Sequence, residues 1–261
     1  MMEKVRRKVN SGTYSLPSLA LRALIDLAVG QYNTGMCGRF TLRVPASVVA
    51  QQFSLFEEPS WRPRFNIAPS QPVLAVRLAS GPGEPGREGV PLRWGLIPSW
   101  AGDPAIGNRL INARAETAAE KPAFRAAWLR RRCLVAADGF YEWQRQGKQR
   151  QPHFICMRDG RPFAFAGLWE SWEGPDHSAV ESCTLLTTEA NDLVRTIHDR
   201  MPVIVAPADY ARWFDPATPR TELSALLGPY PSDSMTAWPV STLVNSPGNE
   251  DPRCIEPAAG P

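Results

Sequence analysis

The sequence is a succession of short apolar segments separated by turns, and this pattern restricts the folds that it can adopt. Proline supplies 26 of the 261 residues, about twice its usual share. Residues 73–78 alternate like a strand, and a stretch over 80–91 rich in glycine and proline separates them from a second apolar segment at 92–97. Similar patterns predict further strands at 133–137, 153–157, 163–169, 183–188, 202–205 and 239–245.

Turn residues and helical spacing complete this outline. Asp159 and Gly160 predict a hairpin between 153–157 and 163–169, and residues 144–152 predict a turn. Residues 118–132 predict a helix with Phe124, Trp128 and Leu129 on one face. Shorter helices are expected at 190–197, 208–214 and 222–227. Many short strands with few long helices indicate the α+β class, with a mainly antiparallel, barrel-like curled sheet as the core and short flanking helices.

Charge and cysteine usage exclude several classes of protein. The 29 Lys and Arg side chains nearly balance the 26 Asp and Glu, which leaves a net charge of +3 and excludes a histone-like protein and an acidic disordered tail. Five widely spaced cysteines without a Cys-x-x-Cys pair, and three histidines, argue against a disulfide framework and a metal site. The sequence has no apolar run of the roughly 18 residues that a membrane span needs. We therefore expect a cytoplasmic protein that uses no metal or other cofactor.

The first 35 residues differ from the remainder in charge. They hold five basic and two acidic side chains, so they account for the whole net charge, and residues 36–261 are neutral overall. Helical spacing predicts one short amphipathic helix at 17–29, but Arg22 and Asp26 interrupt the apolar stretch that a secretory signal needs. We expect an N-terminal extension at 1–35, either a loosely attached helix or the product of an unused upstream start, followed by a single domain at 36–250 and a disordered tail at 251–261.

Met36 is a second possible start, and it directly precedes Cys37. Removal of Met36 would leave Cys37 with both a thiol and a free α-amine, whose pKa is normally near 8. Such an aminothiol condenses with an aldehyde to an imine, and the thiol then closes a five-membered thiazolidine. The alternative for Cys37 is a small buried side chain, the commonest fate of a free cysteine.

Five further segments combine with the Met-Cys-Gly-Arg-Phe start to give a recognisable set. They are Pro-Arg-Phe-Asn-Ile-Ala-Pro-Ser at 63–70, Arg-Trp-Gly-Leu-Ile-Pro-Ser-Trp at 93–100, Ile-Asn-Ala-Arg-Ala-Glu-Thr at 111–117, Ala-Asp-Gly-Phe-Tyr-Glu-Trp at 137–143 and Ile-His-Asp-Arg-Met-Pro at 197–202. In order and spacing these segments resemble the SRAP family, the SOS-response-associated peptidase-like proteins. The resemblance extends from residue 36 to about residue 250.

The resemblance implies a specific activity. Members of the family bind single-stranded DNA, often at a junction with duplex, and crosslink to abasic sites through an N-terminal cysteine. The thiazolidine that forms with the ring-opened deoxyribose shields the lesion. By this resemblance Cys37 is the nucleophile, Asn112 holds the abasic sugar, Glu142 transfers protons and His198 assists ring opening and imine formation. It also implies a monomer that is associated with the nucleoid when it binds DNA.

The chemistry of the reaction agrees with these roles, although each residue has a structural alternative. A closed hemiacetal must be opened and a carbinolamine must lose water, which a carboxyl group and an imidazole can assist. Glu142 is either a salt-bridged surface carboxylate or, between Tyr141 and Trp143, a shielded carboxyl with a raised pKa. His198 is otherwise a residue favoured at a helix C-terminus, and Asn112 a turn or cap residue.

Further residues are expected to contact DNA. Arg39, Arg114 and Arg200 match arginines of the family segments and are expected to pair with phosphates, for which the planar guanidinium is suited. Trp100, beside a polar loop, is expected to stack on an exposed base. Two other residues are expected near the site: Asn66, which could instead fix a turn before Pro69, and Thr187 at an interior strand position. Core packing is expected for Trp94, Trp143 and Trp169.

The extension at 1–36 departs from the family pattern. An amide nitrogen cannot condense with an aldehyde, so the crosslinking hypothesis requires Cys37 to be the mature N-terminus. Three alternatives stay open: a peptidase in which Cys37 releases its own leader, a glutamine amidotransferase, and a non-covalent single-strand binder. The amidotransferases also begin with Cys-Gly, but Arg39 and Phe40 and the other segments have no counterpart there.

Overall fold

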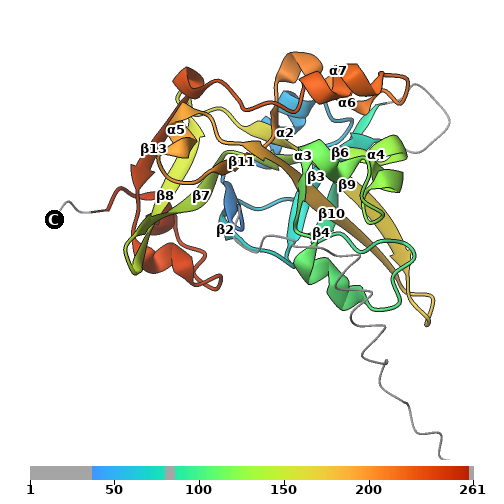
Figure 1. Ribbon diagram of the computed structural model, residues 1–261, viewed down its shortest axis with the longest axis horizontal. Coiled ribbons are helices and arrows are strands. Elements are labelled where there is room, and N and C mark those ends of the chain that lie inside the picture. Colours follow the sequence, from blue (N-terminus) through green and yellow to red (C-terminus); the bar gives the residue numbers. More distant parts are fainter. Residues whose placement is uncertain (1–36, 80–85, 259–261) are drawn as a thin grey trace, which may run out of the picture. The chain divides into compact units, whose positions relative to one another are not determined.

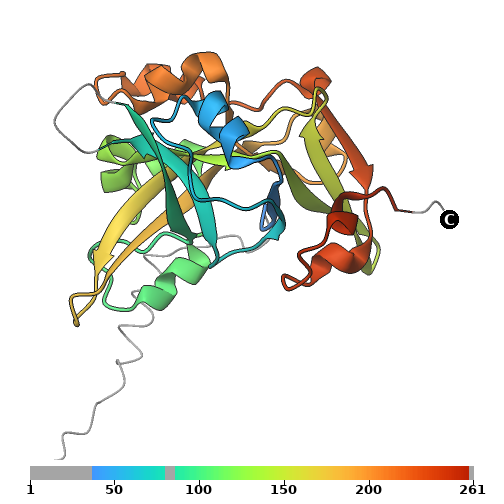
Figure 2. The ribbon, with the colours of Figure 1, turned by 180° about the vertical axis from the view of Figure 1, so that it is seen from behind.

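The computed structural model describes residues 37–79 and 86–258, and within these ranges the strands form two sheets (Figures 1 and 2). In the first sheet every neighbouring pair is antiparallel. Its strands, in spatial order, are β13 (Met235–Pro239), β8 (Gln149–Met157), β7 (Gly139–Gln146), β1 (Phe40–Leu42) and β2 (Arg64–Ile67).

The second sheet closes on itself. Its spatial order is β11 (Arg200–Pro202), β10 (Ala179–Glu189), β4 (Arg87–Trp94), β3 (Pro72–Leu78), β6 (Arg132–Ala137), β9 (Phe163–Glu173) and β12 (Ile204–Val205), and β5 (Asn112–Arg114) pairs with β10. Because β10 also pairs with β9, the strands β10, β4, β3, β6 and β9 form a closed barrel. The β4–β10 pair is parallel and the other barrel pairs are antiparallel.

Short helices accompany the two sheets. The α-helices are α2 (Ala46–Phe53), α3 (Ala115–Ala118), α4 (Arg125–Arg130), α5 (Asp192–Arg195), α6 (Tyr210–Phe214) and α7 (Arg220–Ala225), and the 3-10 helices are η1 (Pro104–Arg109), η2 (Pro207–Asp209), η3 (Ser232–Ser234), η4 (Thr242–Asn245) and η5 (Pro252–Ile255). The predicted α+β class, with a mainly antiparallel sheet curled into a barrel and short flanking helices, is confirmed. No described helix is long and apolar enough to span a membrane.

Aromatic packing joins β1 to the barrel. The Phe40 ring contacts the rings of Trp94 on β4 and Phe165 on β9 edge to face, with centroids 5.2 and 5.6 Å apart. All three side chains are fully buried. Such pairs add about 0.5–1.5 kcal/mol beyond the burial of their area. The residues that directly precede β1 are therefore held against the barrel.

Two predicted turns form in the structure, but one does not join the strands of a hairpin and the other is shorter than predicted. The Gly160 N–H donates to Met157 O at 3.0 Å, and Gly160 has a φ of +72°, so the turn forms. The hairpin prediction is nevertheless wrong, because β8 belongs to the first sheet and β9 to the barrel. Local turn chemistry reverses the chain without choosing the sheet that each strand joins. The turn expected at 144–152 is confined to 147–148, with Gly147 at a φ of +61°, since β7 and β8 extend up to it.

Other predicted elements are divided in the structure. The helix expected at 118–132 is replaced by α3 and α4, and Leu129 is 63% exposed. Pro122 explains the break, because it lacks an N–H and restricts the residue before it. The strand expected at 202–205 is split into β11 and β12, which pair with β10 and β9 respectively.

The C-terminal predictions require similar correction. In place of one strand at 239–245, β13 ends at Pro239 and η4 follows, with the Ser241 side chain accepting the Leu243 N–H. The disordered tail expected at 251–261 is wrong for 252–258: η5 lies there, and Cys254 is fully buried. Residues 259–261 and the N-terminal extension, with the helix expected at 17–29, lie outside the described residues. The division of the chain at residue 35 therefore stays a prediction.

Candidate active site

Cys37 lies next to Glu142 because β1 pairs with β7. The antiparallel register places Phe40 opposite Phe140, and the Tyr141 N–H donates to Arg39 O at 2.9 Å. This register carries the preceding residues toward Glu142, and the backbone nitrogen of Cys37 donates to Oε1 of Glu142 at 2.7 Å. Both residues are buried, Cys37 with 1% and Glu142 with 2% of its surface exposed. The reactive nitrogen of the hypothesis is thus within hydrogen-bond distance of a carboxyl oxygen.

Burial sets the protonation of this pair. It raises the pKa of Glu142 to about 8, although hydrogen bonds from the N–H groups of Cys37 and Trp143 act in the opposite direction. The negative charge of Asp199 raises this pKa further. Burial also raises the pKa of the Cys37 thiol, as does the charge of Glu142. Glu142 is therefore a shielded carboxyl that can exchange a proton near neutral pH, and the alternative of a surface salt bridge is excluded.

Asn112 joins Cys37 to the barrel. It begins β5, which pairs with β10 so that Asn112 is aligned with Leu185. Its Nδ2 donates to Cys37 O at 3.3 Å, and 8% of its surface is exposed. Asn112 therefore lies at the carbonyl group of Cys37, the predicted nucleophile. A residue that holds the sugar next to Cys37 would need such a position.

His198 follows α5 and is held by its neighbours. Its own N–H donates to Val194 O at 2.8 Å, and its Nδ1 accepts the Arg200 N–H at 3.1 Å. Nδ1 also lies 3.0 Å from Oδ1 of Asp199. While Nδ1 accepts from Arg200, the neutral ring carries its proton on Nε2, and protonation of Nδ1 would direct it to Asp199. The imidazole thus has a partner for each protonation state.

The segment that carries His198 lies against the strand that carries Glu142. Gln144 on β7 donates through Nε2 to Thr196 O at 2.8 Å. Asp199 acts electrostatically on Glu142, which requires the two side chains to be near each other. The structure therefore brings Cys37, Asn112, Glu142 and the 196–199 segment to one region.

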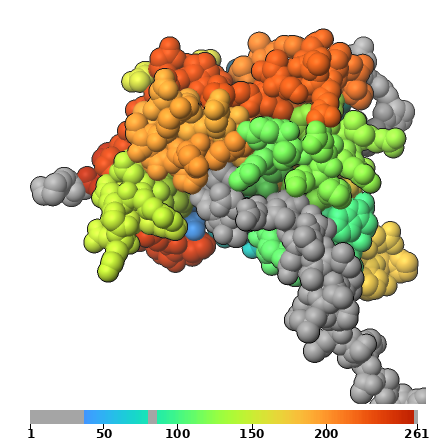
Figure 3. All heavy atoms as spheres, in the orientation of Figure 1, coloured from blue at the N-terminus to red at the C-terminus, as the bar shows by residue number. Residues whose placement is uncertain are grey.

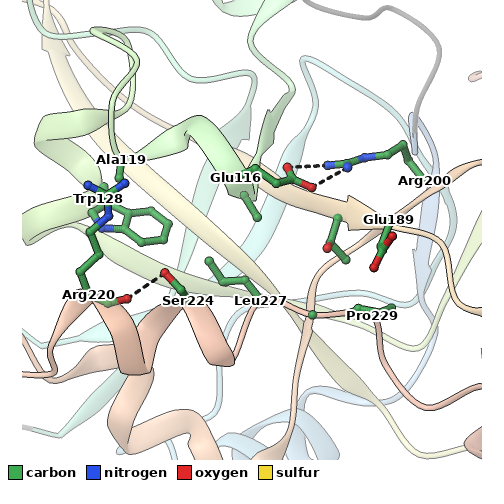
Figure 4. Close-up of a pocket in the computed structure, with 12 residues that line it drawn as sticks. Glu116, Ala119, Trp128, Glu189, Arg200, Arg220, Ser224, Leu227 and Pro229 are labelled. Carbon is green, nitrogen blue, oxygen red and sulfur yellow. Dashed lines mark hydrogen bonds and ion pairs between the residues drawn. The ribbon is translucent and has the colours of Figure 1, made fainter.

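Arg200 forms a two-point ion pair that sequence reasoning missed. Its NH1 and NH2 donate to the two carboxylate oxygens of Glu116 at 2.6 and 2.9 Å (Figure 4). NH2 also donates to Thr187 O at 2.7 Å. Although partial burial raises the pKa of Glu116, the hydrogen bonds and positive charge of Arg200, with help from Arg114, bring it below its usual value. In Figure 3 the orange segment around α5 and the green segment around α3 lie side by side on one face. The sequence could have indicated Glu116 only through its position in the 111–117 segment.

Asn66 contacts protein groups in this structure, and a contact with DNA stays a prediction. It is fully buried, and its Oδ1 accepts from NH1 of Arg39 at 2.7 Å. Its Nδ2 lies 2.9 Å from both Ser246 O and Asn249 O. The alternative interpretation, a structural asparagine, is closer to the observed role, although the partner is the C-terminal segment 244–250 rather than a turn before Pro69.

Arg39 takes part in the same network. NH1 of Arg39 also donates to Val244 O at 2.6 Å, and the guanidinium carbon lies 5.9 Å from the centre of the Trp143 ring. Only 8% of Arg39 is exposed. Its observed contacts are thus to protein groups, and a contact with phosphate stays a prediction.

The remaining predicted DNA contacts differ in exposure. Trp100 is 60% exposed and Arg114 is exposed, whereas Thr187 is fully buried, with its Oγ1 3.5 Å from Ala113 O. Thr187 therefore has the interior strand position that was expected. Of the three tryptophans assigned to the core, Trp94 is fully buried, while the other two are partly buried beneath the guanidinium groups of Arg39 and Arg77.

Metal ligands do not gather in the described part of the chain. Within residues 37–79 and 86–258, no group of three or more His, Cys, Asp and Glu side chains is arranged to hold a metal ion.

Comparison with known proteins identifies the family. The family model described as SOS response associated peptidase (SRAP) matches residues 36–247. The chain belongs to the SRAP family. The suspected resemblance is therefore confirmed.

Relatives of this SRAP protein have informative names. It is 45% identical over 226 residues to the abasic site processing protein YoqW of Bacillus subtilis, an alignment that covers 85% of this chain and 99% of YoqW. It is 33% identical over 270 residues to the abasic site processing protein HMCES of Mus musculus, covering 85% and 76% of the two chains. A crystal structure of a protein from Bacteroides thetaiotaomicron shares the fold, with a TM-score of 0.78 at 24% identity, over 85% of this chain and all of the other.

The SRAP segments converge on the site through the contacts described above. The 137–143 segment supplies Glu142 and the 111–117 segment supplies Asn112, both bonded to Cys37. The 63–70 segment is linked to the site by the hydrogen bond between Asn66 and Arg39. The 197–202 segment contacts the 111–117 segment through the ion pair of Arg200 and Glu116. Sequence reasoning missed Glu116, Asp199 and the C-terminal segment 244–250.

Proposed function

We propose that this SRAP protein processes abasic sites in single-stranded DNA by forming a covalent thiazolidine with the sugar through Cys37. The observation that carries the proposal is the 2.7 Å contact between the Cys37 nitrogen and Oε1 of Glu142. The names of YoqW and HMCES, both abasic site processing proteins, support the substrate class.

The first step needs a neutral amine beside a proton acceptor. Without residue 36 the Cys37 nitrogen is an α-amine, with an ordinary pKa near 8. With an amide at Cys37, burial raises the pKa of the facing Glu142 carboxyl to about 8. An ammonium group at Cys37 would instead favour the carboxylate beside it, and the two groups would titrate as a coupled pair in which Glu142 can take the ammonium proton and return it. The neutral amine then attacks the aldehyde carbon.

The second step removes water and closes the ring. Glu142 donates its proton to the carbinolamine hydroxyl, which leaves as water, and then takes back the nitrogen proton of the resulting iminium to give the imine. The Cys37 sulfur adds to the imine carbon, and the thiol proton passes to the nitrogen. One aldehyde and one aminothiol thus give one thiazolidine and one water.

His198 and Asn112 act on the sugar before these steps. The ring-closed sugar opens when a proton leaves its anomeric hydroxyl and another reaches the ring oxygen. His198 can provide both transfers when its Nδ1–H faces Asp199, because Nε2 is then free to take the hydroxyl proton and to pass it to the ring oxygen. Asn112, at the Cys37 carbonyl, holds the sugar hydroxyl groups within reach.

DNA binding falls to the exposed residues around this centre. Arg114, which is exposed, pairs with a phosphate, and Trp100, which is 60% exposed, stacks on a base next to the lesion. Arg200 is less available, because only 17% of its side chain is exposed and Glu116 binds its guanidinium. Arg39 acts mainly by fixing the segment next to Cys37, and Thr187 through its carbonyl on Arg200. The preferred DNA is single-stranded or a junction with duplex, and the protein acts as a monomer associated with the nucleoid.

The state of the thiol favours this function over a peptidase. A cysteine peptidase needs a thiolate, but burial raises the pKa of the Cys37 thiol and keeps it protonated. In the thiazolidine route the amine attacks first, and the thiol adds only to an activated imine. Release of a leader by Cys37 and simple non-covalent binding become outcomes of the test below.

The test uses protein made from its own gene and single-stranded DNA that uracil-DNA glycosylase has treated. Intact mass first identifies the N-terminal residue, because an amide at Cys37 prevents the reaction. We expect mature protein that begins at Cys37 and an adduct that resists heat and detergent. Cys37→Ala should abolish the adduct, whereas Cys156→Ala, at another buried cysteine, should retain it. A full-length protein without adduct, or an adduct that persists in Cys37→Ala, contradicts the proposal.

A further inference from the structure

The Arg200 side chain is held more tightly than a surface phosphate ligand needs. Both carboxylate oxygens of Glu116 accept from it, at 2.6 and 2.9 Å, and Thr187 O accepts a third bond at 2.7 Å. The two partners lie on different elements, α3 and β10. A bidentate pair of this kind fixes the orientation of the guanidinium as well as its position.

The main chain of the same arginine orients His198. The Arg200 N–H donates to Nδ1 of His198 at 3.1 Å, and the same nitrogen lies 3.0 Å from Oδ1 of Asp199. Because these two neighbours compete for Nδ1, the position of the Arg200 main chain helps to decide both the tautomer and the direction of the imidazole. Arg200 is only two residues from His198, so a shift of Arg200 also moves the ring.

A cavity beside the ion pair leaves Arg200 dependent on Glu116. The cavity has a volume of about 490 Å³, and its lining includes Glu116, Arg200, Arg220, Ser224 and Leu227 (Figure 4). Packing does not close this side of the guanidinium, so without the carboxylate the side chain has room to turn. Its Nε, which has no hydrogen-bond partner among the described residues, would not hold it in place.

The negative charge of the Glu116 carboxylate disfavours DNA binding at Arg200. Its low pKa keeps Glu116 negative at neutral pH, so it neutralises the arginine that faces the phosphate backbone. A phosphate that approaches Arg200 therefore meets a guanidinium already bound to an anion. Each lysine or arginine that pairs with a phosphate adds about 0.7 to the salt dependence of single-strand binding.

We infer that Glu116 is a positioning residue for His198, which acts through Arg200, and that its charge lowers the non-covalent affinity for DNA. The inference rests on the proposed function and adds to it a residue that does not touch the substrate. Glu116 thus has opposite effects on binding and on the rate of crosslinking. A purely structural role would move both in the same direction.

The experiment compares Glu116→Gln with a matched control, Glu120→Gln. Glu120 lies one helical turn further along, pairs with Arg220 at 3.0 Å and does not contact Arg200. Both variants remove one negative charge. Salt-dependent binding of abasic single-stranded DNA is measured in a Cys37→Ala background, and the single-turnover crosslinking rate is measured at saturating DNA with Cys37 intact.

We expect Glu116→Gln to bind DNA more tightly at low salt, with a slope in log Kd against log salt that is steeper by about 0.7, as one more phosphate is engaged. Its crosslinking rate should fall by about 10- to 100-fold, as expected when a reacting group is misplaced. Glu120→Gln should crosslink at the wild-type rate. Glu116→Asp, which keeps the charge with a shorter reach, should keep the wild-type salt slope.

A second measurement does not depend on crosslinking. The chain has three histidines, so the nitrogen resonances of His198 can be assigned by comparison with His198→Asn. In wild-type protein we expect a single tautomer of the neutral ring, and in Glu116→Gln a mixture of both tautomers. An unchanged tautomer, an unchanged crosslinking rate, or DNA binding that weakens together with the rate overturns the inference. Absence of any Cys37-dependent adduct in wild-type protein overturns the proposed function instead, and the tautomer measurement still decides the role of Glu116.

Discussion

The two sides of the candidate site use the same kinds of side chain in different ways. The buried side consists of Cys37, Arg39, Asn66 and Glu142. The second group, called the rim, consists of the ion pair of Glu116 and Arg200 together with the exposed Trp100 and Arg114, which we propose to contact DNA. On the buried side the arginine binds an amide and a carbonyl group, and the carboxyl faces a backbone nitrogen. On the rim the arginine and the carboxylate bind each other.

The two glutamates show what this difference does. Burial beside a backbone N–H raises the pKa of Glu142 to about 8. At Glu116, partial burial also raises the pKa, but the bidentate contact with Arg200 outweighs it and leaves the pKa below its usual value. The neighbour of the carboxyl group therefore decides its use: Glu142 can exchange protons at neutral pH, whereas Glu116 stays charged and can hold another residue in place.

The largest effect is expected from Glu142→Gln on the crosslinking rate. The amide cannot take or return a proton, so both formation and reversal of the crosslink should slow by about 10²- to 10⁴-fold. Quantification of the adduct over time at saturating abasic DNA measures the effect. Glu173→Gln, at an exposed glutamate paired with His177, is the control and should retain the wild-type rate. A variant that crosslinks as fast as the wild type, or faster, would remove the distinction between the two glutamates.

A smaller effect is expected on stability, in the full-length chain in which an amide precedes Cys37. The pKa of Glu142 is raised from 4.5 to about 8 on folding, so the folded state binds the proton more tightly than the unfolded state. Stability therefore falls as the pH rises above about 4.5, and the loss is complete above about 8. Relative to Glu142→Gln, the wild type should lose up to about 4 kcal/mol between about pH 5 and about pH 9.

Urea unfolding across this range measures that difference. The difference in unfolding free energy between the wild type and Glu116→Gln should stay constant over this range. The pKa of Glu116 is lowered on folding, so its contribution to stability is already complete above the pKa that it has in the unfolded chain. Parallel stability curves for the wild type and Glu142→Gln would contradict the assignment of Glu142 as the carboxyl with the raised pKa.

The sequence indicated the surroundings of Glu142 better than those of Asn66. In the 137–143 segment Glu142 lies between Tyr141 and Trp143, so a shielded carboxyl was one of two alternatives, and burial decides between them. The role of Asn66 could not be predicted, because its carbonyl partners Ser246 and Asn249 lie 180 and 183 residues away in the chain. The failed hairpin at Gly160 has the same cause: a turn is a local property, whereas the choice between two sheets depends on strands that are distant in sequence.

The smallest effect is expected from a rim residue. Trp100→Ala should weaken binding of single-stranded DNA by about 1–3 kcal/mol, the usual contribution of one base stacked on an aromatic ring. Its unfolding free energy should stay within about 0.5 kcal/mol of the wild type, because an exposed side chain away from the core contributes little. Leu129→Ala is the control, since Leu129 is 63% exposed compared with 60% for Trp100. Equal affinities for the two variants would show that rim exposure alone does not identify a DNA contact.

The contact between Asn66 and the 244–250 segment has a consequence for biosynthesis. The surroundings of Cys37 include Arg39, which is fixed by Asn66 and by Val244 O, and Asn66 in turn binds carbonyl groups as far along as Asn249. A ribosome makes the nucleophile near the start of the domain and its supports near the end. The site is therefore assembled only after residues 244–249 have been made, and a nascent chain stalled before residue 244 would carry Cys37 without the structure that surrounds it.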